Sequence, residues 1–122
     1  MEINAYQKLA MTTLNPALQG KDVLINGVMG LCGEAGEAID LVKKHLAQGH
    51  PLDRERLAGE LGDIAWYLAE TALAIDYDLD TVCRMNLEKL KERYPEGFSR
   101  ERSLCRREET LFPGEKQKEN EG

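Results

Sequence analysis

Apolar residues recur at spacings of three and four along nearly the whole chain, whereas alternating runs of β-branched residues are almost absent. Spacings of three and four place side chains on one face of an α-helix, while a half-buried strand needs strict alternation. The chain has 122 residues, a length that suits a single domain. We therefore expect an all-α fold, built as a bundle of four to five helices.

Proline, glycine and capping residues divide this pattern into four predicted helices. Pro16 is expected to end the first helix, the run Gly49-His50-Pro51 to end the second, and Asp53 to cap the third. Asp78 or Asp80 is expected to cap the fourth. The predicted helices cover about residues 3–14, 23–48 and 54–76, and the fourth ends near residue 94. The domain then covers residues 1–98, and residues 99–122, which are mostly charged, form a C-terminal tail.

Charge, hydropathy and cysteine content exclude several classes of protein. The net charge is −6 and no basic stripe compensates for it, so we expect no binding to duplex nucleic acid. The longest nearly apolar stretch, Val23–Cys32, is too short to span a membrane. The first residues, Met-Glu-Ile-Asn, show neither a basic region nor an apolar core, so we expect no secretion. The three cysteines are an odd number at wide spacing. We expect reduced thiols and a cytoplasmic location.

The second and third predicted helices carry matching acidic motifs. Gly33-Glu34-Ala35-Gly36-Glu37 is echoed 26 residues later by Gly59-Glu60-Leu61-Gly62-Asp63. At about 100° per residue, each acidic pair falls at the same edge of the apolar stripe, which centres on Ala35 in one helix and Leu61 in the other. If the two helices pack antiparallel, four carboxylates meet in one cleft.

One acidic pair alone is typical of a solvated helix surface, but two matched pairs beside glycines indicate a site. Each glycine inside a helix costs about 0.5–1 kcal/mol relative to alanine, so close helix approach or room for a ligand must offset it. Four carboxylates repel one another unless a cation neutralises them, and oxygen ligands suit Mg²⁺, with Mn²⁺ as a substitute. A ferritin-like di-iron site would need Glu-x-x-His pairs, which these helices lack. We predict a metal site of one or two ions formed by Glu34, Glu37, Glu60 and Asp63.

The fourth predicted helix adds basic side chains. Asn86, Lys89 and Arg93 stand at positions i, i+3 and i+7, which places them on one stripe. Alone, the stripe is typical of a basic face exposed to solvent. Set opposite an acidic metal site, the same side chains are suited to bind phosphate oxygens.

These motifs in this order resemble the MazG-like members of the all-α NTP pyrophosphohydrolase superfamily. The family signature is Glu-x-x-Glu, then Glu-x-x-Asp on the next helix, then a basic stripe, and no signature acid is missing here. The likeness extends from the helix that contains Tyr6 to about Ser99. It implies a catalytic domain over residues 1–98, Mg²⁺-dependent cleavage of nucleoside triphosphates between the α and β phosphates, and homo-oligomers.

Individual roles follow from this hypothesis. Glu34 or Glu37 would accept the proton of the attacking water, while Lys89, Arg93 and Asn86 would bind the phosphates. Tyr67 is a candidate for the nucleoside pocket, and core packing is nearly as good an explanation for it. The base preference and the cellular role, such as house-cleaning of the nucleotide pool, stay open. The alternative function is a non-catalytic module that binds metal or nucleotide.

The third predicted helix also has more apolar surface than one core requires. Its apolar arc spans about 200°, whereas a helix facing one core needs little more than about 100°. We assign the surplus, which carries Trp66, Ala69 and Leu73, to a subunit interface. The expected assembly is a homodimer or homotetramer.

Overall fold

The computed structural model describes residues 1–105 and is all-helical over that range. No strand occurs in these residues, and Pro95 and Gly97 form only an isolated bridge. The helices are α1 (Ile3–Met11), α2 (Lys21–Gln48), α3 (Arg54–Ala74), α4 (Leu79–Arg93) and α5 (Arg100–Leu104). The prediction of an all-α fold is confirmed for these residues. None of these helices is both long and apolar enough to cross a membrane.

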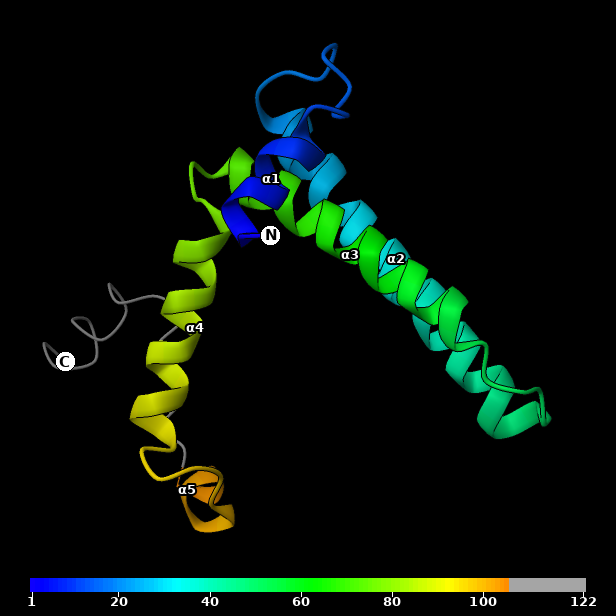
Figure 1. The fold of residues 1–122 in the computed structure, drawn as a ribbon, viewed down its shortest axis with the longest axis vertical. Helices are drawn as coiled ribbons and strands as arrows, with labels where there is room; N and C mark the ends of the chain where they lie inside the picture. The colour runs from blue at the N-terminus through cyan, green and yellow to red at the C-terminus, as the bar shows by residue number, and fades with distance from the viewer. Residues whose placement is uncertain (106–122) are drawn as a thin grey trace, which may run out of the picture. The chain divides into compact units, whose positions relative to one another are not determined.

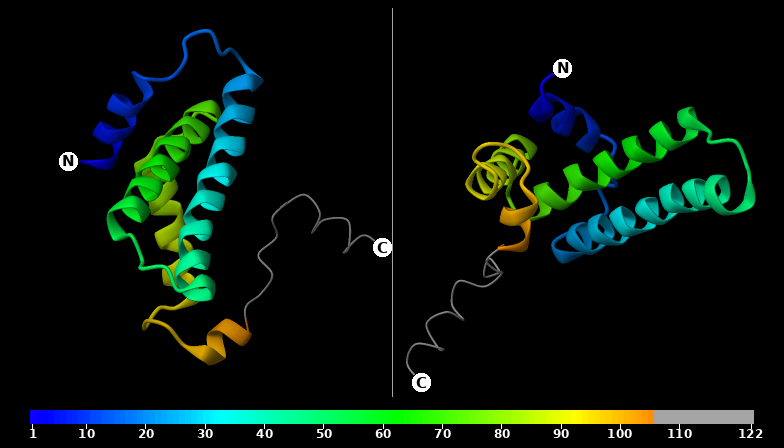
Figure 2. Two further views of the ribbon diagram at one scale, coloured as in Figure 1. Left: turned by 90° about the vertical axis from the view of Figure 1, so that its right-hand side faces the viewer. Right: turned by 90° about the horizontal axis from the view of Figure 1, so that it is seen from below.

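The chain divides into two compact units, Met1–Arg84 and Met85–Gly122. In the first unit, α2 and α3 lie side by side and antiparallel, joined by a short loop at one end (Figures 1 and 2). Helix α1 packs on α3 near the other end of this pair. The pair carries both acidic motifs, so the antiparallel arrangement expected from the sequence is present.

The fully buried apolar core of the described residues is small. It consists of Ala69 and Ala72 of α3 and Leu79 at the start of α4. Tyr6, Ala10 and Met11 of α1, which are partly buried, pack against it. The core therefore lies where α1 crosses the end of α3, and much of the length of α2 and α3 contributes nothing to it.

Local signals explain most helix ends. The Asp53 carboxylate accepts a hydrogen bond from the Arg56 amide (3.0 Å), as the sequence predicts for an N-cap. Gly49 ends α2 in the left-handed conformation (φ 72°), which glycine adopts without steric cost. Asp78, one of the two predicted caps of α4, accepts from the Thr81 amide (2.7 Å).

Two helices are shorter than predicted. Helix α1 ends at Met11 and not at residue 14, because the hydroxyls of Thr12 and Thr13 donate to carbonyls three residues earlier, at 2.6 Å each. Helix α3 ends at Ala74, two residues early, and Asp76 follows with a positive φ of 61°.

The second unit begins within α4 and contains a turn and α5. Gly97 adopts a φ of 88°, and the rings of Tyr94 and Phe98 lie 5.5 Å apart on either side of the turn. Ser99 caps α5 by accepting from the Arg102 amide (3.3 Å). The first part of the predicted tail is therefore helical, and its remainder, residues 106–122, lies outside the described residues.

Candidate metal site

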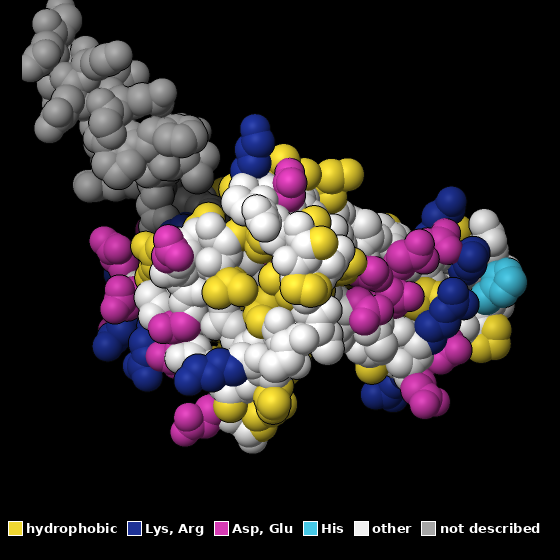
Figure 3. Space-filling view, turned by 90° about the horizontal axis from the view of Figure 1, so that it is seen from above, with side chains coloured by type: hydrophobic (Ala, Val, Ile, Leu, Met, Phe, Trp, Pro, Cys, Tyr) yellow, Lys and Arg dark blue, Asp and Glu magenta, His cyan; other side chains and the backbone are white. Residues whose placement is uncertain are grey.

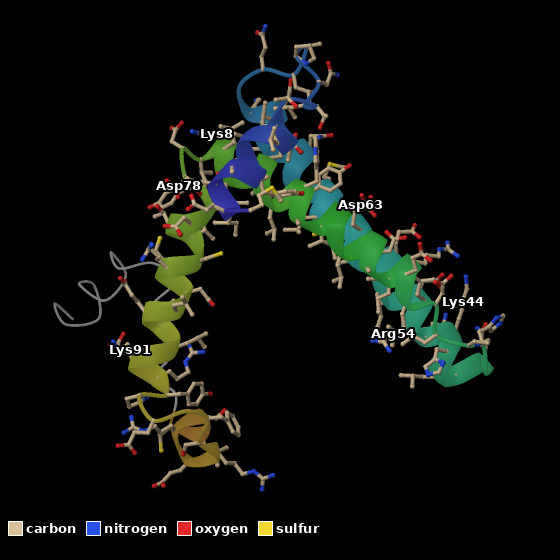
Figure 4. The ribbon with its side chains drawn as sticks, in the orientation of Figure 1. Lys8, Lys44, Arg54, Asp63, Asp78 and Lys91 are labelled. Carbon is tan, nitrogen blue, oxygen red and sulfur yellow. The ribbon has the colours of Figure 1, made fainter. Side chains whose placement is uncertain are left out.

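Three of the four predicted acids meet in the first unit. Glu34 comes from α2, and Glu60 and Asp63 come from α3. One carboxylate oxygen of each lies within 4.8 Å of the other two. Glu34 and Glu60 are half-buried, while Asp63 is exposed. Figure 4 shows Asp63 on α3, part-way between α1 and the end of the pair that carries Lys44 and Arg54. In the space-filling view, acidic side chains gather on one stretch of the surface, next to Lys, Arg and His side chains (Figure 3).

Small residues on α2 let the two helices approach closely on one side of this cluster. A Cβ atom added at Gly27 would lie 2.5 Å from the Thr71 hydroxyl and 3.2 Å from the Thr71 backbone nitrogen. At Gly30 an added Cβ would overlap the ring of Tyr67. Close approach, one of the two reasons expected for the glycines, therefore applies to these two positions.

The glycines of the acidic motifs are different. A Cβ atom added at Gly33, Gly36, Gly59 or Gly62 would meet nothing within 4 Å. These four glycines do not serve the packing of α2 on α3 within one chain. Their open space leaves room beside the acids, which agrees with the second reason expected from the sequence.

The acid cluster is electrostatically unfavourable without a cation. The pKa of Glu34 is raised above its ordinary value, first by a hydrogen bond with the Glu60 side chain and then by desolvation. The negative charges of Asp63, Glu60 and Glu37 raise it further. A cation that binds between these carboxylates would relieve the repulsion between them.

Glu37 is exposed and stands apart from the three clustered acids, although its charge is close enough to act on Glu34. It lies one turn further along α2 than Glu34, on the same helix face. Its predicted part in the metal site stays a prediction.

The donor set fits a hard divalent cation. Glu34, Glu60 and Asp63 offer oxygen ligands alone, which is the preference of Mg²⁺ and Mn²⁺. Three carboxylates also leave coordination positions for phosphate oxygens and water, as Mg²⁺ sites that bind phosphate substrates require. These three residues could therefore hold such an ion.

The predicted phosphate-binding residues lie further along α4, in the second unit. Asn86, Lys89 and Arg93 occupy one continuous helix, so their expected spacing on one stripe is present. Asn86 and Lys89 are exposed and Arg93 is half-buried. Their binding of phosphate stays a prediction.

The predicted interface residues of α3 are largely used inside the chain. Trp66 is half-buried, and its indole N–H donates to the Ala10 carbonyl (3.1 Å) and the Thr13 hydroxyl (2.8 Å) of the α1 region. Ala69 is 0% exposed, so it offers no surface to a second subunit, which corrects its assignment to an interface. Leu73 is 45% exposed and keeps the surface that the prediction needs.

The opposite side of α3 is the more exposed one. Leu61, the expected centre of the core-facing stripe, is 56% exposed, and Leu68 is 42% exposed. The reason is that α1 covers the side of α3 that carries Trp66 and Ala69. The apolar surplus of α3 is therefore real, but its uncovered part centres on Leu61.

Tyr67 packs between α2 and α3. Its ring lies over Gly30 and makes an edge-to-face contact with Trp66, with centroids 5.0 Å apart. Core packing, the second explanation considered for Tyr67, is thus present. A part in a nucleoside pocket stays a prediction.

Sequence reasoning missed a buried carboxyl group near the site. Glu70 of α3 is 0% exposed, and both its oxygens accept hydrogen bonds from the Asn26 amide nitrogen of α2, at 2.8 and 3.0 Å. Glu70 is seven residues after Asp63, so it continues the acidic edge of α3. That spacing is the signal by which the sequence could have indicated it.

Comparisons with known proteins agree with the site. The family model of the MazG nucleotide pyrophosphohydrolase domain matches residues 26–98. This range contains all four acids of the repeated motif and the basic stripe. The Gene 37 protein of Mycobacterium phage L5 is 38% identical over 105 residues, which cover 80% of this chain and 92% of the phage protein. No solved structure matches the chain. From the acid motifs, the helical fold and these matches, the chain belongs to the MazG nucleotide pyrophosphohydrolase domain family.

Proposed function

We propose that this protein is a Mg²⁺-dependent nucleoside triphosphate pyrophosphohydrolase, which converts an NTP or dNTP and water into the monophosphate and pyrophosphate. The observation that carries the proposal is the meeting of Glu34, Glu60 and Asp63 within 4.8 Å, from two helices. Membership of the MazG family supports a hydrolase that acts on nucleotides. House-cleaning of the nucleotide pool is a cellular role compatible with this reaction.

The acidic residues would have two roles, and Glu34 and Glu37 are candidates for both. Glu34, Glu60 and Asp63, with Glu37 beside them, would hold Mg²⁺, and Mn²⁺ would substitute. A bound divalent cation supplies neutralisation of the phosphate charge that develops during cleavage. Glu34 or Glu37 would accept the proton of the attacking water, because a carboxylate next to the scissile phosphate can act as general base.

The basic stripe of α4 would bind the triphosphate. Lys89 and Arg93 carry the positive charges that stabilise a departing pyrophosphate, and Arg93 can bind two phosphate oxygens at once. Asn86 would donate a hydrogen bond to the sugar-phosphate. Tyr67, one turn past Asp63, is the candidate for contact with the nucleoside.

The deciding experiment is pyrophosphate release from a panel of NTPs and dNTPs, with Mg²⁺ and with a chelator. Glu60→Gln should lower kcat/KM by at least about a hundredfold, because it removes a carboxylate ligand of the metal while the volume of the side chain stays nearly the same. Glu55→Gln is the matched control, since Glu55 is an exposed acid in the first turn of the same helix and outside the cluster. It should stay close to wild type.

The outcomes separate the alternatives. Wild-type turnover without a divalent cation, or full activity of Glu60→Gln at saturating Mg²⁺, would contradict the proposed metal site. Binding of Mg²⁺ and nucleotide without release of pyrophosphate would instead support the alternative, a non-catalytic binding module.

We also propose that the chain functions as a homodimer or homotetramer. Ala69, Ala72 and Leu79 are the fully buried apolar residues of residues 1–105, a small core for a domain of this size. Large apolar side chains of α2 and α3 are exposed at the same time, including Met29 at 69% and Leu61 at 56%. A second copy would cover this surface.

Sedimentation of wild type and of Leu61→Glu tests the oligomer. The variant should shift to smaller species, because a charge would be placed within the apolar contact. Leu9→Glu is a suitable control, since Leu9 is 64% exposed and lies on α1, not on α2 or α3. A wild-type protein that sediments as a monomer at micromolar concentration would refute the proposal.

A further inference from the structure

One side of the α2–α3 pair is a row of matched contacts that ends at the acid cluster. The row consists of three pairs, Asn26 with Glu70, Gly30 with Tyr67, and Glu34 with Asp63. On each helix these positions are three or four residues apart, so they lie on one side of it. Because the helices run antiparallel, each turn forward on α2 is matched by a turn back on α3 (Figure 2). The register that joins the first pair is therefore the register that brings Glu34 to Asp63.

The pair of Asn26 and Glu70 is the directional contact of this row. The amide nitrogen of Asn26 donates to both carboxylate oxygens, at 2.8 and 3.0 Å, and Glu70 is 0% exposed. A buried carboxylate that loses its donor is strongly destabilising, so registers that separate the two groups are disfavoured. A single polar residue within the interface fixes the register of coiled coils for the same reason.

Apolar packing within one chain specifies this register less well. Gly27 is the one buried residue of α2, a helix that lies wholly within the described residues. On α3, Leu61 and Leu68 are 56% and 42% exposed. Apolar attraction has no direction of its own, so half-exposed side chains tolerate a small slip of one helix along the other. The hydrogen bonds between Asn26 and Glu70 do not tolerate it.

A slip would be felt directly at the acid cluster. Glu34 lies eight residues after Asn26, about 12 Å along α2. Asp63 lies seven residues before Glu70, about 10 Å along α3. A slip by the rise of one residue, about 1.5 Å, would move Glu34 past Asp63 and Glu60 by the same amount. Mg²⁺ needs near-octahedral ligands at about 2.0–2.1 Å, and a functional site tolerates displacements of about 0.5 Å.

We propose that Asn26 and Glu70 are positioning residues for the metal site. Their hydrogen bonds set the register of α2 on α3, and with it the position of Glu34 relative to the acids of α3. The proposal rests on the metal site that the proposed function assigns to the acid cluster, to which neither residue belongs. Both residues and the cluster lie within the first unit, Met1–Arg84.

The test separates the hydrogen-bond acceptor at Glu70 from its negative charge. Glu70→Gln keeps a carbonyl acceptor for Asn26, Glu70→Met keeps only the length of the side chain, and both remove the charge. Mn²⁺ is titrated into each protein without nucleotide, and the EPR signal of the free ion gives the affinity. Glu70→Gln should stay within about twofold of wild type. Glu70→Met should bind Mn²⁺ about tenfold more weakly, a usual loss when the support of a ligand is removed.

Two other variants test the donor side of the pair. Asn26→Ala keeps the charge of Glu70 but removes its donor, so it should also bind Mn²⁺ about tenfold more weakly when measured well below its Tm. In a Glu70→Met background, Asn26→Ala should weaken binding no further, because both residues act through the same hydrogen bonds. If Glu70→Met does not fold, the comparison of Asn26→Ala with Glu70→Gln decides the question.

Stability measurements separate positioning from simple destabilisation. In urea unfolding, Glu70→Met should be at least as stable as wild type, because an apolar side chain replaces a buried carboxylate. Asp53→Ala is the matched control, since it removes the cap of α3, where Asp53 accepts from the Arg56 amide at 3.0 Å. It should lower stability while its affinity for Mn²⁺ stays within about twofold of wild type.

The outcomes also distinguish this inference from the proposed function. If the wild type binds Mn²⁺ but releases no pyrophosphate from NTPs, the proposed function fails, and a tenfold loss in Glu70→Met alone still supports positioning. Equal weakening in Glu70→Gln and Glu70→Met would assign the effect to charge and overturn the inference. Wild-type affinity in Asn26→Ala, or a loss as large in Asp53→Ala, would overturn it as well. If Glu60→Gln binds Mn²⁺ as wild type does, the ion binds elsewhere and the inference fails together with the metal site.

Discussion

Replacing Asn26 with alanine should destabilise the protein more than most changes on α2. The Asn26 amide nitrogen donates to both oxygens of Glu70, and Glu70 is 0% exposed. In Asn26→Ala that carboxylate stays buried without this donor. Breaking such a buried polar pair lowers the free energy of unfolding by about 3 kcal/mol, and the higher helix propensity of alanine offsets about 0.5 kcal/mol of this loss. The net loss of about 2.5 kcal/mol corresponds to a fall in Tm of roughly 10–20 °C.

Thermal and urea unfolding of a double-mutant cycle measures this loss. Glu70→Met removes the carboxylate and keeps an apolar side chain of similar length, so in that background Asn26→Ala should cost little. The double variant should therefore be more stable than Asn26→Ala alone. If Asn26→Ala stays within about 0.5 kcal/mol of wild type, the reasoning about the buried pair is refuted.

Three further predictions concern packing, pH and metal. Gly27→Ala should lose about 1–3 kcal/mol because the added methyl meets α3, whereas Gly33→Ala, which faces open space, should gain about 0.5–1 kcal/mol in urea unfolding. The Asp78 pKa is lowered by its hydrogen bond from a backbone amide, so its stabilisation is present above the ordinary aspartate pKa and is lost as the pH falls through the lowered value. Asp78→Asn should flatten that acid limb of the stability curve, and an unchanged limb would contradict the assignment. Mg²⁺ should raise the Tm of wild type, and Glu60→Gln should be more stable than wild type without metal but respond less to Mg²⁺ in calorimetry.

Local sequence signals were sufficient for the first four helices, to within a few residues, and for bringing together three of the four acids of the candidate metal site. The 3.6-residue period, the Asp53 cap and the glycine at position 49 act within a few residues, so they predict helix limits without knowledge of the rest of the fold. The two acidic motifs fall at matching wheel positions, which placed Glu34 beside Glu60 once antiparallel packing was assumed.

The tertiary structure alone decided which face of α3 is covered. A helical wheel gives the angle between Leu61 and Trp66 but does not say which face another element will occupy. Helix α1, at the N-terminus, packs on the side of α3 that carries Trp66 and Ala69, and Leu61 stays exposed. Contacts between residues more than 40 positions apart carry no local period. For this reason the hydrogen bonds from Asn26 to Glu70, and those from the Leu79 and Asp80 amides of α4 to the Gln7 and Asn4 side chains of α1, appeared only in the folded chain.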